Sequence, residues 1–261
     1  MEVVALPVLA IVLVVGLVAL FVWAHRKTEE RRRLWRELAE RRGGRYFPPE
    51  WSWLRSGSEA FEVRAGHAIV RVDLYVVSHG ESSTTYTRAR AHYALGAGPR
   101  MAVYAQGVLS SIGKALGTQD LELGDPELDD VFMVKGDDVE ALRRVWTKPA
   151  RAVALNQLRQ ARVEAHGPEV TLTCPGAVAD VRTLEAMLEL VGELASADAR
   201  DLDRIAALPD ASLVPAAGTC DAPVSAHVRI GTAAGDAVAT VRPGARGPRL
   251  MLSLPSERAL P

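Results

Sequence analysis

Several short stretches of this sequence place side chains at spacings that resemble catalytic or ligand-binding motifs. The segment Gly107–Ala115, GVLSSIGKA, resembles a phosphate-binding loop, but five residues separate its two glycines where four are needed. It also lacks Ser or Thr after Lys114. Because the backbone amides of such a loop must converge on the phosphate, we exclude nucleotide binding through this segment.

The acidic turn Asp125–Asp130 and the thiol of Cys174 are the two positions around which an enzyme of unrecognised type would be built. The turn lacks the alternating oxygen ligands, central glycine and distal glutamate of an EF-hand. Helix capping explains Asp125 and Asp137 without a bound ligand. Cys174 and Cys220 do not have zinc-ligand spacing, and we expect both to be reduced, apolar side chains.

Histidines and serines give no stronger signal. No two of the six histidines lie four residues apart on a helix or beside a cysteine pair. His79 with Ser82 and Ser83 lacks the G-x-S-x-G elbow of a nucleophilic serine. We therefore expect a solvated turn there, and the sequence predicts no catalytic residue, no metal ligand and no cofactor.

Basic side chains form the candidate contact surface. One group follows the N-terminal apolar segment, and a second alternates along two predicted strands, so that its members share one face. The candidate residues for contact with anionic lipid or a protein partner are Arg26, Lys27, Arg31, Arg32, Arg33, Arg71, Arg88 and Arg90. Two alternatives stay open: the first group only sets topology, and the second is a solvated face neutralised by aspartates. A net charge of -1 for the whole chain gives no reason to expect nucleic-acid binding.

The N-terminal segment is apolar over a length that matches a bilayer. Val3–Ala24 carries no charge, and at about 1.5 Å per residue a helix of this length spans roughly 33 Å. A cleaved signal peptide is the alternative, but Glu2 stands where such a peptide needs a positive charge. We expect a single transmembrane helix over residues 1–24 in the inner (plasma) membrane, with residues 3–24 contacting the bilayer.

The arginines that follow predict the orientation. Cytoplasmic flanks carry an excess of Lys and Arg, so the C-terminal domain is expected in the cytoplasm. Glutamates interleave with these arginines at helical spacing until Gly43-Gly44. Residues 25–45 are therefore expected to continue the helix as a basic stalk that holds the domain away from the bilayer. Leu34 and Leu38 share a face that would suit dimerisation of this stalk.

The next part, residues 46–208, is expected to be an α+β domain. Alternating residues predict strands at Ile69–Val77 and Tyr86–Leu95, joined by a loop at Ser78–Thr84. Further strands are expected at 101–105, 131–134, 162–165 and 169–174. Helices are expected after Asp125, Asp137, Thr147 and Asp180.

The stretch from Asp125 to Cys174 resembles the core of an uncharacterised family of bacterial membrane-anchored proteins, a domain of unknown function. In that family an Asp-rich turn precedes a Phe-x-Val-x-Gly-Asp strand and a helix that ends at a Thr-Pro joint. The matching residues here are Asp125, Asp129, Phe132, Val134, Gly136, Asp137 and Thr147-Lys148-Pro149, with Lys148 inserted into the joint. The resemblance brings no catalytic residues.

Composition changes after Leu208-Pro209. Residues 209–261 are expected to form a Pro/Ala-rich linker and a small β meander with strands near 226–230, 237–242 and 250–254. The fold class is therefore α+β: a transmembrane helix, a charged stalk, and an antiparallel sheet packed with helices.

The sequence favours a membrane-anchored cytoplasmic interaction or scaffold domain over an enzyme. Two alternatives stay open. One is an enzyme of unrecognised type with a cleft near Cys174 or Asp125–Asp130. The other is a cell-envelope protein whose domain lies outside the cytoplasm, which would require the charge rule to fail.

Overall fold

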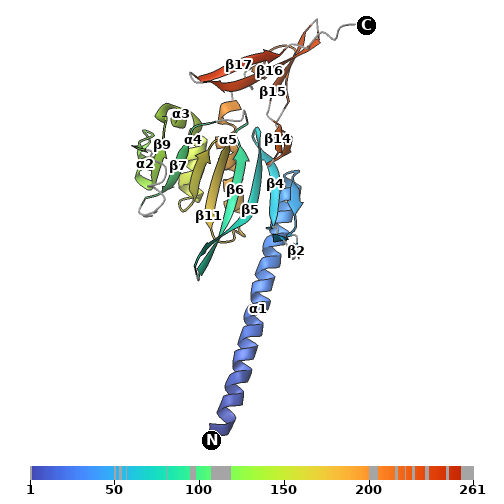
Figure 1. Cartoon of the computed structure of the whole chain (residues 1–261), viewed down its shortest axis with the longest axis vertical. Coiled ribbons are helices and arrows are strands. Elements are labelled where there is room, and N and C mark those ends of the chain that lie inside the picture. Colours follow the sequence, from blue (N-terminus) through green and yellow to red (C-terminus); the bar gives the residue numbers. More distant parts are fainter. Residues whose placement is uncertain are drawn as a thin grey trace.

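The architecture is an α+β domain carried by one long N-terminal helix (Figure 1). The computed structural model describes the backbone at residues 2–49, 51–52, 55–56, 58–80, 82–94, 98–106, 119–199, 205–214, 217–220, 222–224, 227–232, 235–244 and 247–253. Side chains are described at fewer positions, beginning at Leu13. The first twelve side chains of the expected anchor and the segment Gly107–Ala115 therefore lie outside the described residues.

Helix α1 spans Glu2–Arg41 without interruption. Gly43, at φ 63°, ends it, and the amide of Gly44 bonds the carbonyl of Ala39 at 2.8 Å. Among the described side chains, no helix presents an apolar stretch of the length needed to cross a membrane.

The main sheet has nine antiparallel strands in the order β1-β4-β5-β6-β11-β10-β7-β9-β8. The bounds of these strands are β1 Arg45–Phe47, β4 Ala60–Ala65, β5 Ala68–His79, β6 Ser82–His92, β7 Met101–Ala105, β8 Gln119–Leu121, β9 Phe132–Gly136, β10 Arg162–His166 and β11 Glu169–Pro175. A separate pair joins β2 (Trp51–Ser52) to β3 (Arg55–Ser56).

All the helices of the domain lie on one face of this sheet (Figure 1). They are α2 Pro126–Val131, α3 Val139–Val145, α4 Lys148–Gln157 and α5 Val181–Ala195, followed by a short 3-10 turn, η1 Ala197–Ala199. Helix α5 begins where Asp180 accepts a hydrogen bond from the amide of Thr183 at 2.8 Å, and its apolar stripe packs on β4, β5, β6 and β11. Within the described residues the other face of the sheet carries no helix, and buried Cys220 contacts part of it through Glu62 and Arg90.

The C-terminal part forms its own sheet in the order β12-β15-β16-β17, with a two-stranded ribbon of β13 and β14. These strands are β12 Ala211–Val214, β13 Ala217–Thr219, β14 Ala222–Val224, β15 His227–Thr232, β16 Gly235–Gly244 and β17 Gly247–Ser253. Buried Val228 joins this sheet to Ala94 and Ala199 of the main body. Strands β15, β16 and β17 pair consecutively where the meander was expected, and the expected linker contains strands β12, β13 and β14.

Three local expectations differ from the structure. The capping aspartate of α3 is Asp138, which accepts from the amide of Ala141 at 2.9 Å, and not Asp137. The loop expected at Ser78–Thr84 is mostly strand, since β5 continues to His79 and β6 resumes at Ser82. Residues 25–45, expected to be a stalk that holds the domain away from the bilayer, are packed into the domain over their second half.

The C-terminal end of α1, from Trp35 onward, is part of the hydrophobic core. Trp35, Leu38 and Ala39 are fully buried, and the ring of Trp35 meets the edge of Phe61 with centroids 5.3 Å apart. The indole N–H of Trp35 donates to the carbonyl of Val178 at 3.0 Å. Since Leu38 is enclosed by its own domain, it does not provide a dimerisation face. The C-terminal end of α1 and the domain are one packed unit.

Candidate functional site

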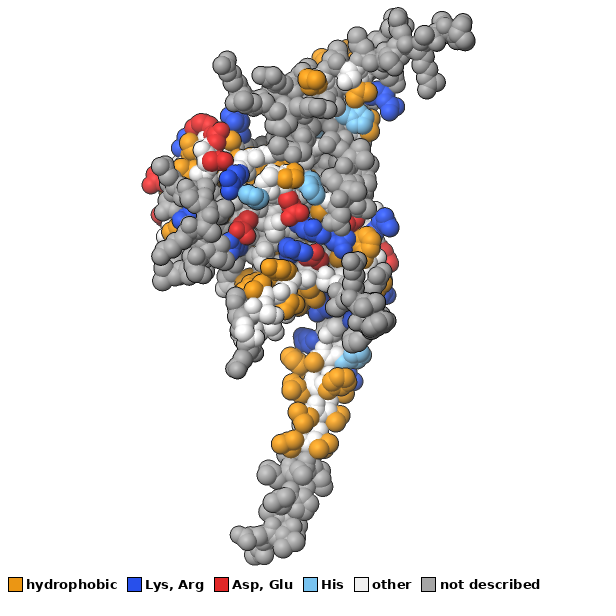
Figure 2. All heavy atoms as spheres, viewed as in Figure 1, with side chains coloured by type: hydrophobic (Ala, Val, Ile, Leu, Met, Phe, Trp, Pro, Cys, Tyr) orange, Lys and Arg blue, Asp and Glu red, His pale blue; other side chains and the backbone are white. Residues whose placement is uncertain are grey.

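The face of the main sheet without helices gathers the three hairpin arginines that the sequence singled out. Arg71 on β5 is paired in register with Arg90 on β6, and Asp73 with Arg88. Residues in register on neighbouring strands share a face, so the four side chains lie together. Figure 2 shows basic and acidic side chains intermixed over these strands.

Asp73 is the centre of this cluster. Its side chain is buried and accepts two hydrogen bonds from Arg88, at 2.9 and 2.8 Å, and Arg90 approaches it to 3.7 Å. The fork geometry of Arg88 on a carboxylate is the strong, bidentate form of an ion pair. The hydrogen bond to Asp73 raises the pKa of Arg88 above its ordinary value. Asp73 therefore fixes the orientation of Arg88.

Two glutamates complete the charge balance. Glu62 on β4, also buried, accepts from Arg71 at 3.1 Å, and Glu169 on β11 lies 3.6 Å from Arg90. The amide of Cys220 lies 3.4 Å from the same Glu62 carboxylate. We call Glu62, Arg71, Asp73, Arg88, Arg90 and Glu169 the charge cluster. The hairpin arginines are thus matched by carboxylates of neighbouring strands, and the Asp-rich segments of the sequence take no part.

The first basic group divides into two sets. Arg31 and Arg32 face the domain. The buried carboxylate of Glu59 pairs with the guanidinium of Arg31 at 2.7 Å and lies 3.8 Å from that of Arg32. The hydroxyl of Tyr46 donates to the same carboxylate at 3.1 Å. Burial, and then the charge of Glu59, raise the pKa of Tyr46 above its ordinary value. Glu59 therefore fastens α1 to the start of β4.

Arg26, Lys27 and Arg33 face solvent. Arg33 pairs with Glu37 one turn along α1 at 2.7 Å, a contact that is exposed on both sides. Arg26 and Lys27 follow the apolar segment after one residue, His25. Contact of these side chains with anionic lipid stays a prediction.

Cys174 does not have the surroundings of a nucleophile. A depression of about 300 Å³ lies beside it, between the end of α4 and the start of α5. The thiol is buried, and burial raises its pKa to about 12. A reactive cysteine needs the opposite, a depressed pKa beside a cation. These surroundings give no support to the enzyme alternative built on Cys174.

The acidic turn Asp125–Asp130 is used in local structure. Asp125 caps α2 through the amide of Leu128 and pairs with Arg151 at 3.1 Å. The hydrogen bond from Arg151 lowers the pKa of Asp125. The carboxylate of Asp129 accepts from the amides at 123, 124 and 125, at 3.0 to 3.1 Å. Within the described residues, no group of three or more His, Cys, Asp or Glu side chains is placed to hold a metal ion.

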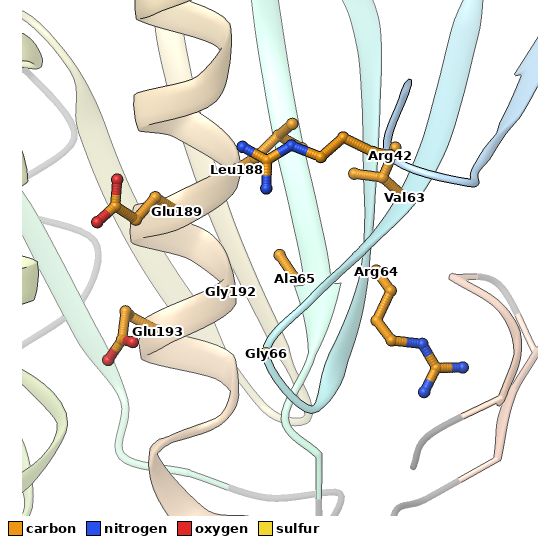
Figure 3. A pocket seen from close by; sticks show the side chains of 9 residues that line it. All are labelled: Arg42, Val63, Arg64, Ala65, Gly66, Leu188, Glu189, Gly192 and Glu193. Atoms are coloured by element: carbon orange, nitrogen blue, oxygen red, sulfur yellow. The ribbon is translucent and has the colours of Figure 1, made fainter. Parts of the chain in front are cut away.

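A second depression, of about 290 Å³, lies between α5 and the β4–β5 turn. Figure 3 shows Arg42 lying across it, while Glu189 and Glu193 project to the side of the helix and Arg64 points away from it. Gly192 allows the close approach of α5 to the sheet, since a Cβ there would lie 2.6 Å from that of Ala65. The polar groups do not converge, so the depression is not arranged to bind a small molecule.

Two further candidates of the sequence lie partly or wholly outside the described residues. The segment Gly107–Ala115 is not described, nor is the side chain of His79. Ser82 and Ser83 are exposed at the β5–β6 turn. Sequence reasoning missed Glu59, Asp73 and Trp35. The one available signal was at Trp35, which interrupts a charged helix.

Comparison with known proteins adds little to this description. No protein-family model matches the chain, and no curated protein matches it either. Among solved structures, it is similar to the crystal structure of the mycobacterial trehalose monomycolate transport factor A, TtfA, with 13% sequence identity and a TM-score of 0.42. That similarity covers 63% of this chain and 92% of the other. The limited resemblance of Asp125–Cys174 to an uncharacterised family agrees with the lack of a match to a family model or a curated protein.

Proposed function

We propose that this chain is a single-pass membrane protein that holds an α+β interaction or scaffold domain at the cytoplasmic face of the membrane. The observation that carries the proposal is the character of α1, which changes along its length. Its described side chains from Leu13 to Trp23 are apolar or glycine and exposed, whereas Trp35, Leu38 and Ala39 near its end are enclosed by the domain. A bilayer and a protein core are the two environments that suit these two segments.

The exposed half of α1 supports the anchor. The described side chains from Leu13 to Trp23 are apolar or glycine and stand out on every side of the helix, with exposed fractions of 43% at Val22 to 73% at Phe21 for the large ones. Figure 2 shows these apolar side chains on both visible edges of the helix. A soluble helix buries one stripe and exposes polar residues elsewhere. Apolar exposure on all sides is typical of a helix in lipid.

The basic flank supports the orientation. Arg26 and Lys27 follow Ala24 after a single residue, His25, at a position where positive charge marks the cytoplasmic side of a membrane helix. A domain outside the cytoplasm is the competing topology. It would place these two cations on the side where such flanks are depleted.

The connection between anchor and domain supports a role in positioning. No loop separates them, because α1 runs unbroken from Glu2 to Arg41 and its end is packed in the core. The contact of Glu59 with Arg31 adds a buried ion pair to this junction. The domain is therefore presented to a partner at a fixed height and rotation relative to the membrane helix.

The helix-free face of the main sheet is the surface proposed for that partner. The charge cluster gives it alternating basic and acidic groups in fixed positions, with Arg71, Arg88 and Arg90 each 19% to 28% exposed. Ordered charges of both signs select a partner surface with the complementary pattern. A protein surface of mixed charge fits this pattern better than a uniformly anionic one.

Membrane integration is tested by alkaline extraction of membranes that carry the full chain. We expect the wild type to stay in the membrane pellet. The double variant Val14→Arg with Val18→Arg should be released from the membrane, since each arginine costs about 2.5 to 3.5 kcal/mol at the centre of a membrane helix. The matched control is Glu30→Arg, which adds an arginine to the exposed part of the same helix outside the apolar segment and should leave the protein in the pellet. Release of the wild type, or retention of the double variant, would overturn the anchor.

The partner surface is tested by photo-crosslinking in intact cells. A crosslinker at Thr173, which is in register with Arg88 on the helix-free face, is expected to give a discrete protein adduct. The control position is Glu189, which is exposed on α5 on the opposite face of the sheet. Adducts from Glu189 alone would place the interaction on the helical face and contradict the proposal.

A further inference from the structure

The hairpin of β5 and β6 extends beyond the sheet to which it belongs. Strand β4 pairs with β5 only as far as Asp73, and β11 pairs with β6 only from Tyr86 onward. Pairing between β5 and β6 continues past both points, from Val76 with Thr85 to His79 with Ser82. We call residues 76–80 and 82–85 the projecting ribbon.

Most described side chains of the projecting ribbon and of Tyr75 at its base are exposed, while Val77 and Thr85 are half-buried. Tyr75 and Val76, which point to opposite faces, are 43% and 54% exposed. The side chains of Ser78, Ser83 and Thr84 are exposed as well. An isolated two-stranded ribbon is at best marginally stable in water. Exposed apolar and hydroxyl side chains on such a ribbon indicate a contact outside the domain.

The direction of the ribbon tells what that contact is. Trp35 of α1 packs on Phe61 of β4, and Phe61 is in register with Val72 of β5. These three residues therefore lie at one level. From that level β5 extends toward the exposed half of α1, in the same direction as α1 traced back toward its N-terminus (Figure 1). The Arg31–Glu59 pair lies one step further in the same direction, which confirms that the two elements run together.

Elementary geometry gives the depth of the ribbon. From Trp35 back to Ala24, a helix covers about 16 Å at about 1.5 Å per residue. From Val72 on to Ser78, a strand covers about 20 Å at about 3.3 Å per residue. The end of the ribbon therefore comes level with Ala24, where the apolar segment of α1 ends and the headgroups of a bilayer would begin.

We propose that the projecting ribbon lies in the lipid headgroup layer of the membrane that holds α1 and forms a second contact of the domain with the bilayer. The inference rests on the proposed anchoring by α1. Tyr75 lies at the base of the ribbon, and tyrosine is enriched at membrane interfaces because its ring is apolar and its hydroxyl is polar. The serines and threonines of the ribbon itself suit a hydrated layer of phosphates and glycerol esters. Figure 2 shows the apolar side chains of this region on the part of the domain nearest the exposed helix.

A second contact would restrict the motion of the domain. One helix alone permits rotation of the domain about the helix axis and tilting toward the bilayer. With the ribbon also held in the headgroups, the sheet stands upright on the membrane, and the charge cluster faces sideways along the membrane surface. A partner that binds the helix-free face would then be a membrane protein or another peripheral domain at the same height.

The experiment measures contact with headgroups in the full chain reconstituted in lipid nanodiscs. A fluorophore is attached to a single introduced cysteine, and quenching by lipids that carry a spin label on the headgroup is compared among three positions. Ser83→Cys reports on the ribbon, and His25→Cys reports on the end of the apolar segment. His166→Cys lies in the turn between β10 and β11, at the opposite end of the sheet, and is the matched exposed control. The native thiols are buried, so the unmodified chain gives the labelling blank.

We expect Ser83→Cys and His25→Cys to lose a similar fraction of their fluorescence and His166→Cys to lose none. Quenching at His25→Cys without quenching at Ser83→Cys would overturn the second contact and leave the anchor in place. Absence of quenching at both would overturn the anchor and, with it, the inference.

Discussion

Replacing Trp35 with alanine tests whether the end of α1 is part of the domain. Trp35 is fully buried, packs edge-on against Phe61, and donates its indole N–H to the carbonyl of Val178. Removing a buried aromatic side chain of this size costs about 3 to 5 kcal/mol. With a urea dependence of about 2 kcal/mol per molar, the midpoint of unfolding should fall by about 2 M.

The assay is urea unfolding of the full chain in nanodiscs, followed by circular dichroism. The matched control is Trp23→Ala, since Trp23 lies on the same helix and is 60% exposed. Its effect on unfolding of the domain should be below about 0.5 kcal/mol. Trp35→Phe, which keeps most of the packing and loses the hydrogen bond, should fall between the two. If Trp35→Ala and Trp23→Ala shift the midpoint equally, α1 is a free stalk and the rigid connection is refuted.

Three further predictions follow from the charge cluster, the buried thiol and the cap of α5. Asp73→Ala leaves Arg88 and Arg90 without their carboxylate and should destabilise the domain by about 3 kcal/mol in urea unfolding, whereas Arg33→Ala should leave the midpoint unchanged. Cys174 should resist thiol reagents at pH 8 until the chain is unfolded, and fast labelling of the folded chain would contradict its burial. Because burial raises the pKa of Cys174 to about 12, the free energy of unfolding should fall as the pH rises from about 9 toward 12. Asp180→Ala should lower the free energy of unfolding by about 1 kcal/mol at neutral pH. Because hydrogen bonds from Thr183 lower the pKa of Asp180, this contribution is present above the ordinary carboxyl pKa and should vanish as the pH falls through the lowered value. Unfolding at pH 7 and at about pH 2 would check this.

Local patterns in the sequence were sufficient for most elements of the fold. Alternation predicted the pairing of Ile69–Val77 with the strand after Tyr86, because one face of each strand packs on helices and the other carries charge. Capping residues predicted the starts of α2, α4 and α5, since a cap depends only on its own first turn. The projecting ribbon was missed because its serines and threonines resemble a loop.

Burial of charge was beyond reach of the sequence. From the sequence, Asp73 is one polar residue on an exposed face. Its burial follows from Arg88 and Arg90 on the neighbouring strand. Alternation predicts the face on which these arginines lie but not the direction in which their side chains point. Glu59 is buried for a similar reason, because Arg31 arrives from a helix 28 residues earlier in the chain. Ion pairs between distant segments depend on the packing of the whole domain.

The measurement that tests the central claim most directly is the topology of the full chain, with one reporter active only in the cytoplasm and a matching one active only outside, each fused after Pro261. The account predicts a membrane-bound protein with activity from the cytoplasmic reporter alone. Activity from the external reporter would contradict the orientation assigned from Arg26 and Lys27. It would also place the charge cluster and the projecting ribbon on the opposite side of the membrane.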